Sequence, residues 1–322
     1  MVLLEILWND ILPLLVFLLV GWILDARLKP DLNTYTKLIT RIVLPLFIFY
    51  SLYLYPPDAS AALLVPAGIA LLFFDSLAAL ALAKILGFTE RKARIFRALS
   101  TFSNSGQIGV ALILMIFSHA PYLAGGEMPY LDEARGTIVV LLILMNIAVN
   151  TFGASLVGVR EFSLSRFFKF IVSMPAVYAV AAAILIKTSG FALEHTFLWS
   201  VLTHFAGAFI ILVTITAGAQ LHRTPWKRPD AFDLGISFNK LFISPLLAFF
   251  LIWSIGIFTP VAAQVFFIYA AVPSSFTLLL FAVDYDNHPD LAARSVLYCS
   301  VIGIFTLTAA IRLARYLFPA GV

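Results

Sequence analysis

The sequence is poor in charge and contains almost no cysteine. Only 12% of its 322 residues are Asp, Glu, Lys or Arg, about half the share in ordinary soluble domains. The single cysteine, Cys299, lies in an apolar stretch, so the chain can form no intrachain disulfide and has no C-x-x-C spacing. The five histidines show no metal-ligand spacing, so we expect no metal site. The net charge of +4 comes from short basic clusters between apolar runs, which argues against a nucleic-acid partner.

What the chain has in abundance is apolar sequence. Hydrophobic residues make up 62% of it, in runs of about 20 residues separated by short polar gaps. Runs of this length cross a bilayer as helices, whereas barrel strands would alternate in polarity over about ten residues. We therefore predict an all-α polytopic membrane protein with ten transmembrane helices. The predicted spans are 6–25, 35–56, 62–86, 93–118, 134–158, 166–186, 196–220, 231–257, 260–283 and 291–316.

The basic residues are distributed unevenly between alternate connections of these spans. One set holds 17 of the 21 Lys and Arg residues: Arg27, Lys29, Lys37, Arg41, Lys84, Arg91, Lys92, Arg94, Arg97, Arg160, Arg166, Lys169, Arg223, Lys227, Arg228, Lys240 and Arg294. The opposite set holds only Arg135, Lys187, Arg312 and Arg315. Because Lys and Arg favour cytoplasmic connections, we predict a protein of the inner or plasma membrane with both termini extracytoplasmic.

Each half of the chain has one predicted span that is interrupted by polar or turn-forming residues. These are the fourth and the ninth spans. A repeat unit of five spans is odd in number, so its second copy must enter the membrane upside down. We therefore predict two inverted five-helix repeats, at 1–160 and 161–322, with a binding site where the broken helices 4 and 9 cross.

The interruption in the fourth span contains Asn104, Ser105 and Gln107, and that in the ninth contains Pro273, Ser274 and Ser275. Such residues free backbone N–H and C=O groups, which persist at membrane depth only against protein or a wet cavity. Each break also exposes the N-terminus of a half-helix, whose N–H groups and partial positive charge suit a carboxylate. The six residues are predicted to bind substrate. Ordinary helix kinks with small-residue packing are the alternative reading of each break alone.

Three further polar residues lie inside predicted spans. Asp75 is near the centre of the third span, where a carboxylate is costly enough that an ion site or a proton carrier is the first reading. A structural acid bonded to a neighbouring helix is the alternative. Asn146 and Asn150 are four residues apart, so both amides face one side of the fifth span. We predict substrate contact for both, although interhelical hydrogen bonding explains them as well.

At this point the sequence resembles the auxin efflux carrier family, which includes plant auxin transporters and bacterial malate or malonate permease-like proteins. The most specific part of the resemblance is the break and exit of the ninth span, Ala271-Val272-Pro273, Phe281-Ala282-Val283-Asp284-Tyr285 and His288-Pro289. Weaker matches are Leu44-Pro45, Asp75-Ser76-Leu77, Asn104 with Gly109, and Lys240 with Pro245. Together these matches touch both halves of the chain.

The resemblance implies ten spans in two inverted repeats, with a scaffold of spans 1, 2, 6 and 7 and a moving unit of spans 3–5 and 8–10. It also implies a homodimer that works by an elevator motion, a substrate-contacting role for Asn104 and an acid near the pocket at Asp75. Plant members have a Lys one turn after that acid; this chain has Ala79, so Asp75 is expected to lack that partner.

The predicted function is secondary transport of small organic anions, either auxin-like monocarboxylates or malate- or malonate-like dicarboxylates. No cofactor is expected, and coupling to H⁺ or Na⁺ stays open, with Asp75 as the candidate coupling residue. An intramembrane enzyme or sensor that uses the same polar site is the alternative. An enzyme would need paired acids, a Ser/His or Cys/His pair, or H-E-x-x-H at membrane depth, and none of these occurs.

Overall fold

The computed structural model describes residues 2–56, 59–158, 162–224 and 226–320. This part of the chain is helical, with two isolated bridges and no β-strand. The helices run in chain order as α1 (Val2–Ile6), η1 (Leu7–Ile11), α2 (Leu12–Leu28), α3 (Leu32–Leu38), η2 (Ile39–Val43), α4 (Leu44–Leu54), α5 (Ala59–Ile85), α6 (Glu90–Thr101), η3 (Ser105–Gly109), α7 (Val110–Phe117), α8 (Leu131–Ala148), η4 (Val149–Gly153), α9 (Ala154–Val157), α10 (Leu164–Ser173), α11 (Pro175–Thr188), η5 (Leu193–His195), α12 (Phe197–His222), α13 (Ala231–Phe238), η6 (Asn239–Ile243), α14 (Ser244–Ile255), α15 (Pro260–Ala270), α16 (Phe276–Asp284) and α17 (Pro289–Leu317). The prediction of an all-α fold is therefore confirmed.

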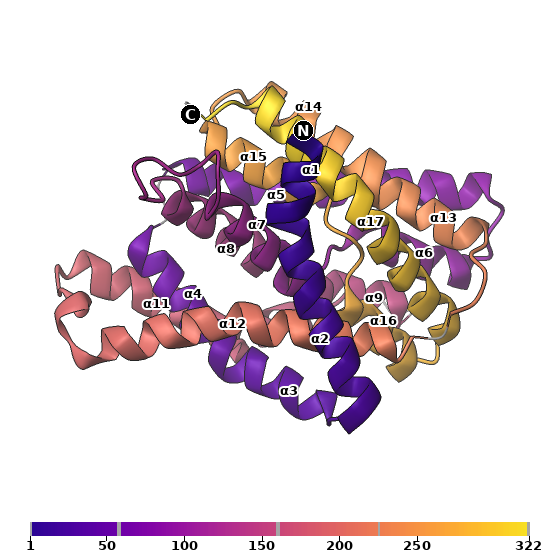
Figure 1. Cartoon of the computed structure of the whole chain (residues 1–322). Helices are drawn as coiled ribbons and strands as arrows, with labels where there is room; N and C mark the ends of the chain where they lie inside the picture. The colour runs from indigo at the N-terminus through magenta and orange to yellow at the C-terminus, as the bar shows by residue number, and fades with distance from the viewer. Residues whose placement is uncertain (1, 57–58, 159–161, 225, 321–322) are drawn as a thin grey trace.

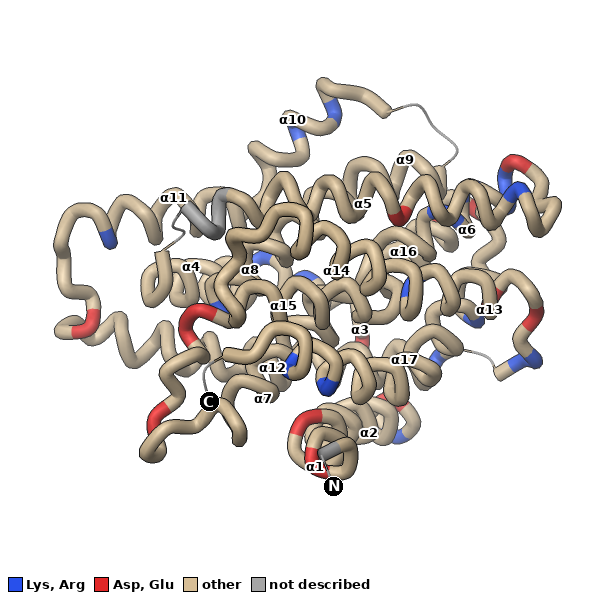
Figure 2. Tube along the Cα trace, turned by 90° about the horizontal axis from the view of Figure 1, so that it is seen from above, with Lys and Arg blue, Asp and Glu red and all other residues tan. Residues whose placement is uncertain are grey.

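Seven of the described helices are long and apolar enough to cross a bilayer, which indicates a membrane protein. They are Leu3–Leu28, Leu32–Leu54, Leu63–Ile85, Leu131–Val157, Phe197–His222, Ala231–Ile255 and Pro289–Leu317. The bent pair α10 and α11, which meet at 59°, counts as an eighth if the two helices form one span. Figure 2 shows α10 set off from the rest of the bundle.

The two predicted spans that carry interruptions are each divided into shorter helices. The segment predicted at 93–118 consists of α6, a break at 102–104, and then η3 continuous with α7. The segment predicted at 260–283 consists of α15, a break at 271–275, and α16. None of these pieces is long enough to cross a bilayer alone. The breaks therefore lie where the residue types predicted them.

Three of the long helices contain a π-helical turn directly before a proline. Pro13, Pro45 and Pro245 each occupy the second position of the α-helical segment that follows η1, η2 or η6. A proline inside a helix has no N–H and clashes with the carbonyl four residues earlier. The wider π-turn makes room for that clash without breaking the helix.

The closest packing in the molecule joins α2 to α12, which cross in Figure 1. A Cβ atom on Gly21 would lie 2.0 Å from the carbonyl oxygen of Ile215, and one on Gly218 would lie 2.0 Å from that of Leu18. Only glycine permits backbones to approach so closely. Helix α4 packs on both α11 and α12, while α5, α6, α8 and α13–α17 pack mainly with one another; α4 with α8 and α12 with η3 are contacts between the two groups. The broken helices belong to this second group.

Candidate functional site

The two helix breaks cross one another and pair through their backbones. The N–H of Asn104 donates to the carbonyl of Pro273 at 2.7 Å, and the N–H of Ser275 donates to the carbonyl of Phe102 at 3.0 Å. Ser103 and Ser274 thereby form a short antiparallel bridge. Each break satisfies backbone groups that the other break frees, so the interruption is sustained within protein rather than in lipid.

Two half-helices begin at this crossing, and each is capped by a predicted site residue. Asn104 Oδ1 accepts a hydrogen bond from the N–H of Gln107 at 3.3 Å, at the start of η3. Ser275 Oγ accepts one from the N–H of Thr277 at 3.3 Å, at the start of α16. The caps satisfy one orphan N–H each and leave the partial positive charge of two helix ends at the crossing.

A cavity of about 110 Å³ lies beside the crossing. Five of the predicted site residues line it: Asn104, Ser105, Gln107, Asn146 and Ser275. The opposite wall carries polar side chains that the sequence analysis did not single out: Thr36, Thr40, Thr216 and Gln220. These four lie on α3, η2 and α12. Thr216 and Gln220 interrupt an apolar run, whereas Thr36 and Thr40 lie in a polar stretch and gave no signal.

A chain of amide hydrogen bonds crosses this cavity. Asn104 Nδ2 donates to Gln107 Oε1 at 3.3 Å, and Gln107 Nε2 donates to Gln220 Oε1 at 3.1 Å. The chain links the break of one helix to α12, which packs in the other group of helices. A ligand with two or more acceptor oxygens could compete for these amide N–H donors, because all three amides line the cavity.

The other three predicted binding residues lie away from this cavity. The ring of Pro273 borders an apolar cavity of about 170 Å³ on the α2 and α17 side. Ser274 is fully buried, and its hydroxyl donates to the carbonyl of Leu99 at 2.6 Å. Asn150 borders a third cavity, and its amide donates to the carbonyl of Asn146 at 2.8 Å. Asn146 itself donates to Leu142 at 3.0 Å, so both amides are engaged within their own helix.

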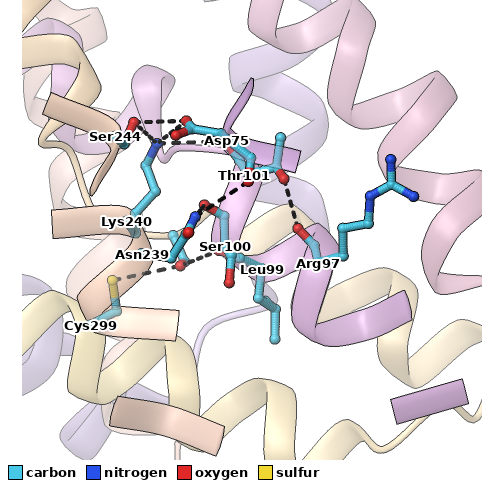
Figure 3. A network of polar contacts seen from close by, with 10 residues as sticks. Asp75, Arg97, Leu99, Ser100, Thr101, Asn239, Lys240, Ser244 and Cys299 are labelled. Atoms are coloured by element: carbon cyan, nitrogen blue, oxygen red, sulfur yellow. Dashed lines mark hydrogen bonds and ion pairs between the residues drawn. The ribbon is translucent and has the colours of Figure 1, made fainter. Parts of the chain in front are cut away.

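Next to the first break, Asp75 forms a buried ion pair with Lys240 (Figure 3). Its Oδ2 is 3.7 Å from Lys240 Nζ and accepts a hydrogen bond from the Ser244 hydroxyl at 2.7 Å. The two charged side chains are 0% and 1% exposed. Lys240 Nζ also donates to the carbonyl of Thr101 at 3.5 Å, at the last residue before the first break. The pair therefore holds the end of α6 against η6.

The backbone around this pair is tied by a neighbouring amide. Asn239 Nδ2 is within 3.5 Å of the carbonyl of Asp75 and within 3.4 Å of that of Ser100. Among the described side chains, Asp75 Oδ1 and the Ser100 hydroxyl are buried without a hydrogen-bond partner. An unpaired carboxylate oxygen at this depth is a place where a proton or a small cation would be stabilised.

Lys240 corrects one expectation from the sequence and extends another. It was counted among the basic connections, but it is buried inside the apolar helix Ala231–Ile255, so the majority set loses one member and the bias remains. Position 79 is indeed alanine, so Asp75 has no partner one turn after it, but Lys240 of another helix supplies a cation at 3.7 Å. A lysine in the middle of an apolar run is itself a signal of function, and it could have been recognised.

The comparisons with known proteins add no assignment. No protein-family model matches the chain, and no curated protein matches it. The interpretation of the site therefore depends on its geometry and chemistry.

Proposed function

We propose that this chain is a secondary transporter of small organic anions, with its substrate carboxylate at the crossing of the two broken helices. The observation that carries this proposal is the polar cavity beside the crossing, lined by residues from both groups of helices. Polar groups are expensive in a membrane interior, so a cluster of polar side chains from both groups of helices around one cavity supports a ligand path.

The chemistry of the cavity favours an anion bound by neutral donors. Two half-helix N-termini supply partial positive charge, and amide groups of Asn104 and Gln107 supply N–H donors. The charge of Lys240 is compensated by Asp75 at 3.7 Å, so the pair contributes little net field. A monocarboxylate or a small dicarboxylate fits this combination of donors, and the choice between them stays open.

The ten-span topology and its inverted repeat belong to the same proposal. Counted as one span each, α6 with α7 and α15 with α16 add two to the seven long helices, and α11, which joins α10 at the bend, makes the tenth. The symmetrical positions of the two breaks, one in each half, support the repeat at 1–160 and 161–322. Discontinuous helices that meet between inverted repeats are the usual binding site of secondary transporters.

The packing also supports a division into two units. Helices α2, α4, α11 and α12 correspond to the predicted scaffold, and the two broken helices lie in the predicted moving unit. The cavity lies between the two, with Gln220 on one side and Gln107 on the other. Motion of one unit past the other would open the cavity to alternate sides of the membrane and break the Gln107–Gln220 hydrogen bond in each cycle. A homodimer held by the scaffold is part of this proposal, from the family resemblance.

Flux into proteoliposomes tests the proposal directly. Purified protein is reconstituted, preloaded with one unlabelled carboxylate from a panel, and supplied with the same carboxylate in radiolabelled form outside. We expect saturable counterflow for at least one small organic anion and none for the matching cation or neutral amide. If no carboxylate of the panel accumulates above protein-free vesicles, with or without Na⁺ and a proton gradient, organic-anion transport is wrong.

A further inference from the structure

Helix α10, Leu164–Ser173, exposes large apolar side chains on one face and basic side chains on another. Three large apolar residues, Leu164, Phe168 and Val172, are 62%, 56% and 64% exposed. They are spaced four residues apart, so they form one stripe along the helix. Helix α10 meets α11 at 59° after Met174, whose extended backbone ends the helix before Pro175.

The other faces of α10 differ sharply in chemistry. Phe167 packs against the rings of Phe152 and Phe162, with centroids 6.4 and 5.9 Å away, and Phe170 packs against the core. The remaining face carries Ser165, Arg166, Lys169 and Ser173, all exposed. No acidic residue occurs between positions 162 and 173. The helix therefore has one face on protein, one exposed apolar stripe and one basic face.

Helices with an apolar stripe beside a basic face lie in the plane of the membrane interface. The apolar stripe enters the acyl region and the basic face meets the headgroups, which attracts anionic lipid in particular. A bend of 59° is compatible with this position, because α11 tilted by about 30° from the bilayer normal would leave α10 close to the membrane plane.

A polar cavity of about 190 Å³ adjoins the basic face. Its lining includes the polar residues Asn150, Thr151, Ser155, Ser163, Arg166 and Tyr285. The cavity is large compared with a single water, which needs about 10–15 Å³. Hydroxyl, amide and guanidinium groups together suit the oxygens of a phosphate.

We propose that α10 is an interfacial helix that recognises anionic phospholipid, with Leu164, Phe168 and Val172 in the acyl region and the headgroup phosphate beside Arg166 and Lys169. The charge of the basic face matches the negative charge of that lipid, and the exposed stripe provides the contact with its chains. This inference requires only that the protein is embedded in a membrane, so it can fail or hold independently of the transported substrate.

The position of α10 is tested by spin-label depth measurements in vesicles of phosphatidylcholine and phosphatidylglycerol. Labels are placed singly at Leu164→Cys, Phe168→Cys and Val172→Cys; the sole native thiol, Cys299, is fully buried and does not compete. An in-plane helix puts all three labels at one depth. A helix that enters the bilayer along its axis would deepen by about 12 Å over these eight residues, and that result would overturn the proposal.

Lipid recognition is tested with a fluorophore on Phe168→Cys and brominated lipids as quenchers. At equal mole fraction in phosphatidylcholine vesicles, brominated phosphatidylglycerol should quench about fivefold more effectively than brominated phosphatidylcholine. The preference should disappear in R166Q/K169Q and persist in K29Q/K84Q, which loses the same charge from two other exposed lysines. Equal quenching by both lipids, or equal loss in the control variant, would refute recognition by this face.

Discussion

At the scale of single residues, the buried pair of Asp75 and Lys240 is the feature with the clearest energetic consequence. Both side chains are buried, and each compensates the charge of the other, which would otherwise be an unpaired charge inside the protein. Lys240→Met removes the cation and leaves a buried carboxylate, so it should cost about 3–5 kcal/mol of stability. The double variant Asp75→Leu/Lys240→Met removes both charges and should recover most of that loss. Thermal unfolding in detergent measures both, and a double variant no more stable than the single one would contradict the ion pair.

The second prediction at this scale concerns the coupling role of Asp75. If its unpartnered Oδ1 takes up a proton during the cycle, Asp75→Asn should bind substrate but lose the dependence of transport on pH. The assay compares initial rates of uptake across a series of external pH values. Wild-type pH dependence in this variant would assign Asp75 a purely structural role as the partner of Lys240.

At the scale of helices, the approach of α2 to α12 gives a prediction with an internal control. Gly218→Ala places a methyl group 2.0 Å from the carbonyl oxygen of Leu18, so the two backbones must separate. We expect a loss of about 1–3 kcal/mol, as for other overpacked contacts. Gly207→Ala lies on the same helix with nothing within 4 Å of the added atom and should be neutral or slightly stabilising. Similar melting temperatures for the two variants would refute the close crossing.

The break before α16 gives a further prediction at this scale. Pro273→Ala restores an N–H and removes a ring, so the helix can recover part of its hydrogen-bond ladder across the break. In the native chain the carbonyl of residue 273 accepts a hydrogen bond from the N–H of Asn104 at 2.7 Å. Recovery of the helix would turn that carbonyl away and break this bond. Transport should fall more than membrane expression does. Unchanged transport per molecule would mean that the break has no part in the cycle.

The two helix breaks could be predicted from sequence because their cause is local. Ser, Asn and Gly at 103–106 and Pro273 with two serines oppose helix formation wherever they occur. The ion partner of Asp75 could not be predicted from spacing, since Lys240 is 165 positions away and lies on a different helix, in η6. Asn146 and Asn150 share a helical face, yet they border different cavities because neighbouring helices divide that face.

At the scale of the whole molecule, the distribution of basic residues predicts an orientation. With Lys240 removed from the count, 16 Lys and Arg residues remain in the majority set of connections, and we expect that set in the cytoplasm. A membrane-impermeant thiol reagent added to intact cells should label Glu127→Cys, which lies in the loop after α7, and spare Lys84→Cys. Permeabilised cells provide the control for Lys84→Cys. The reverse pattern would invert the topology, and with it the sidedness of the cavity. The C-terminal residue 322, predicted outside, falls beyond the described residues.

The central claim, that substrate binds at the crossing of the broken helices, is tested most directly by the affinity of Asn104→Ala for the transported anion. Asn104 lines the cavity, and its amide donates to Gln107. Asn33, an exposed asparagine of α3 that does not line the cavity, is the control. Equilibrium binding of the radiolabelled anion to purified protein should weaken by about five- to 150-fold in Asn104→Ala, which corresponds to about 1–3 kcal/mol. Asn33→Ala should bind as the wild type does. If Asn104→Ala folds and binds with wild-type affinity, the anion does not bind at the crossing.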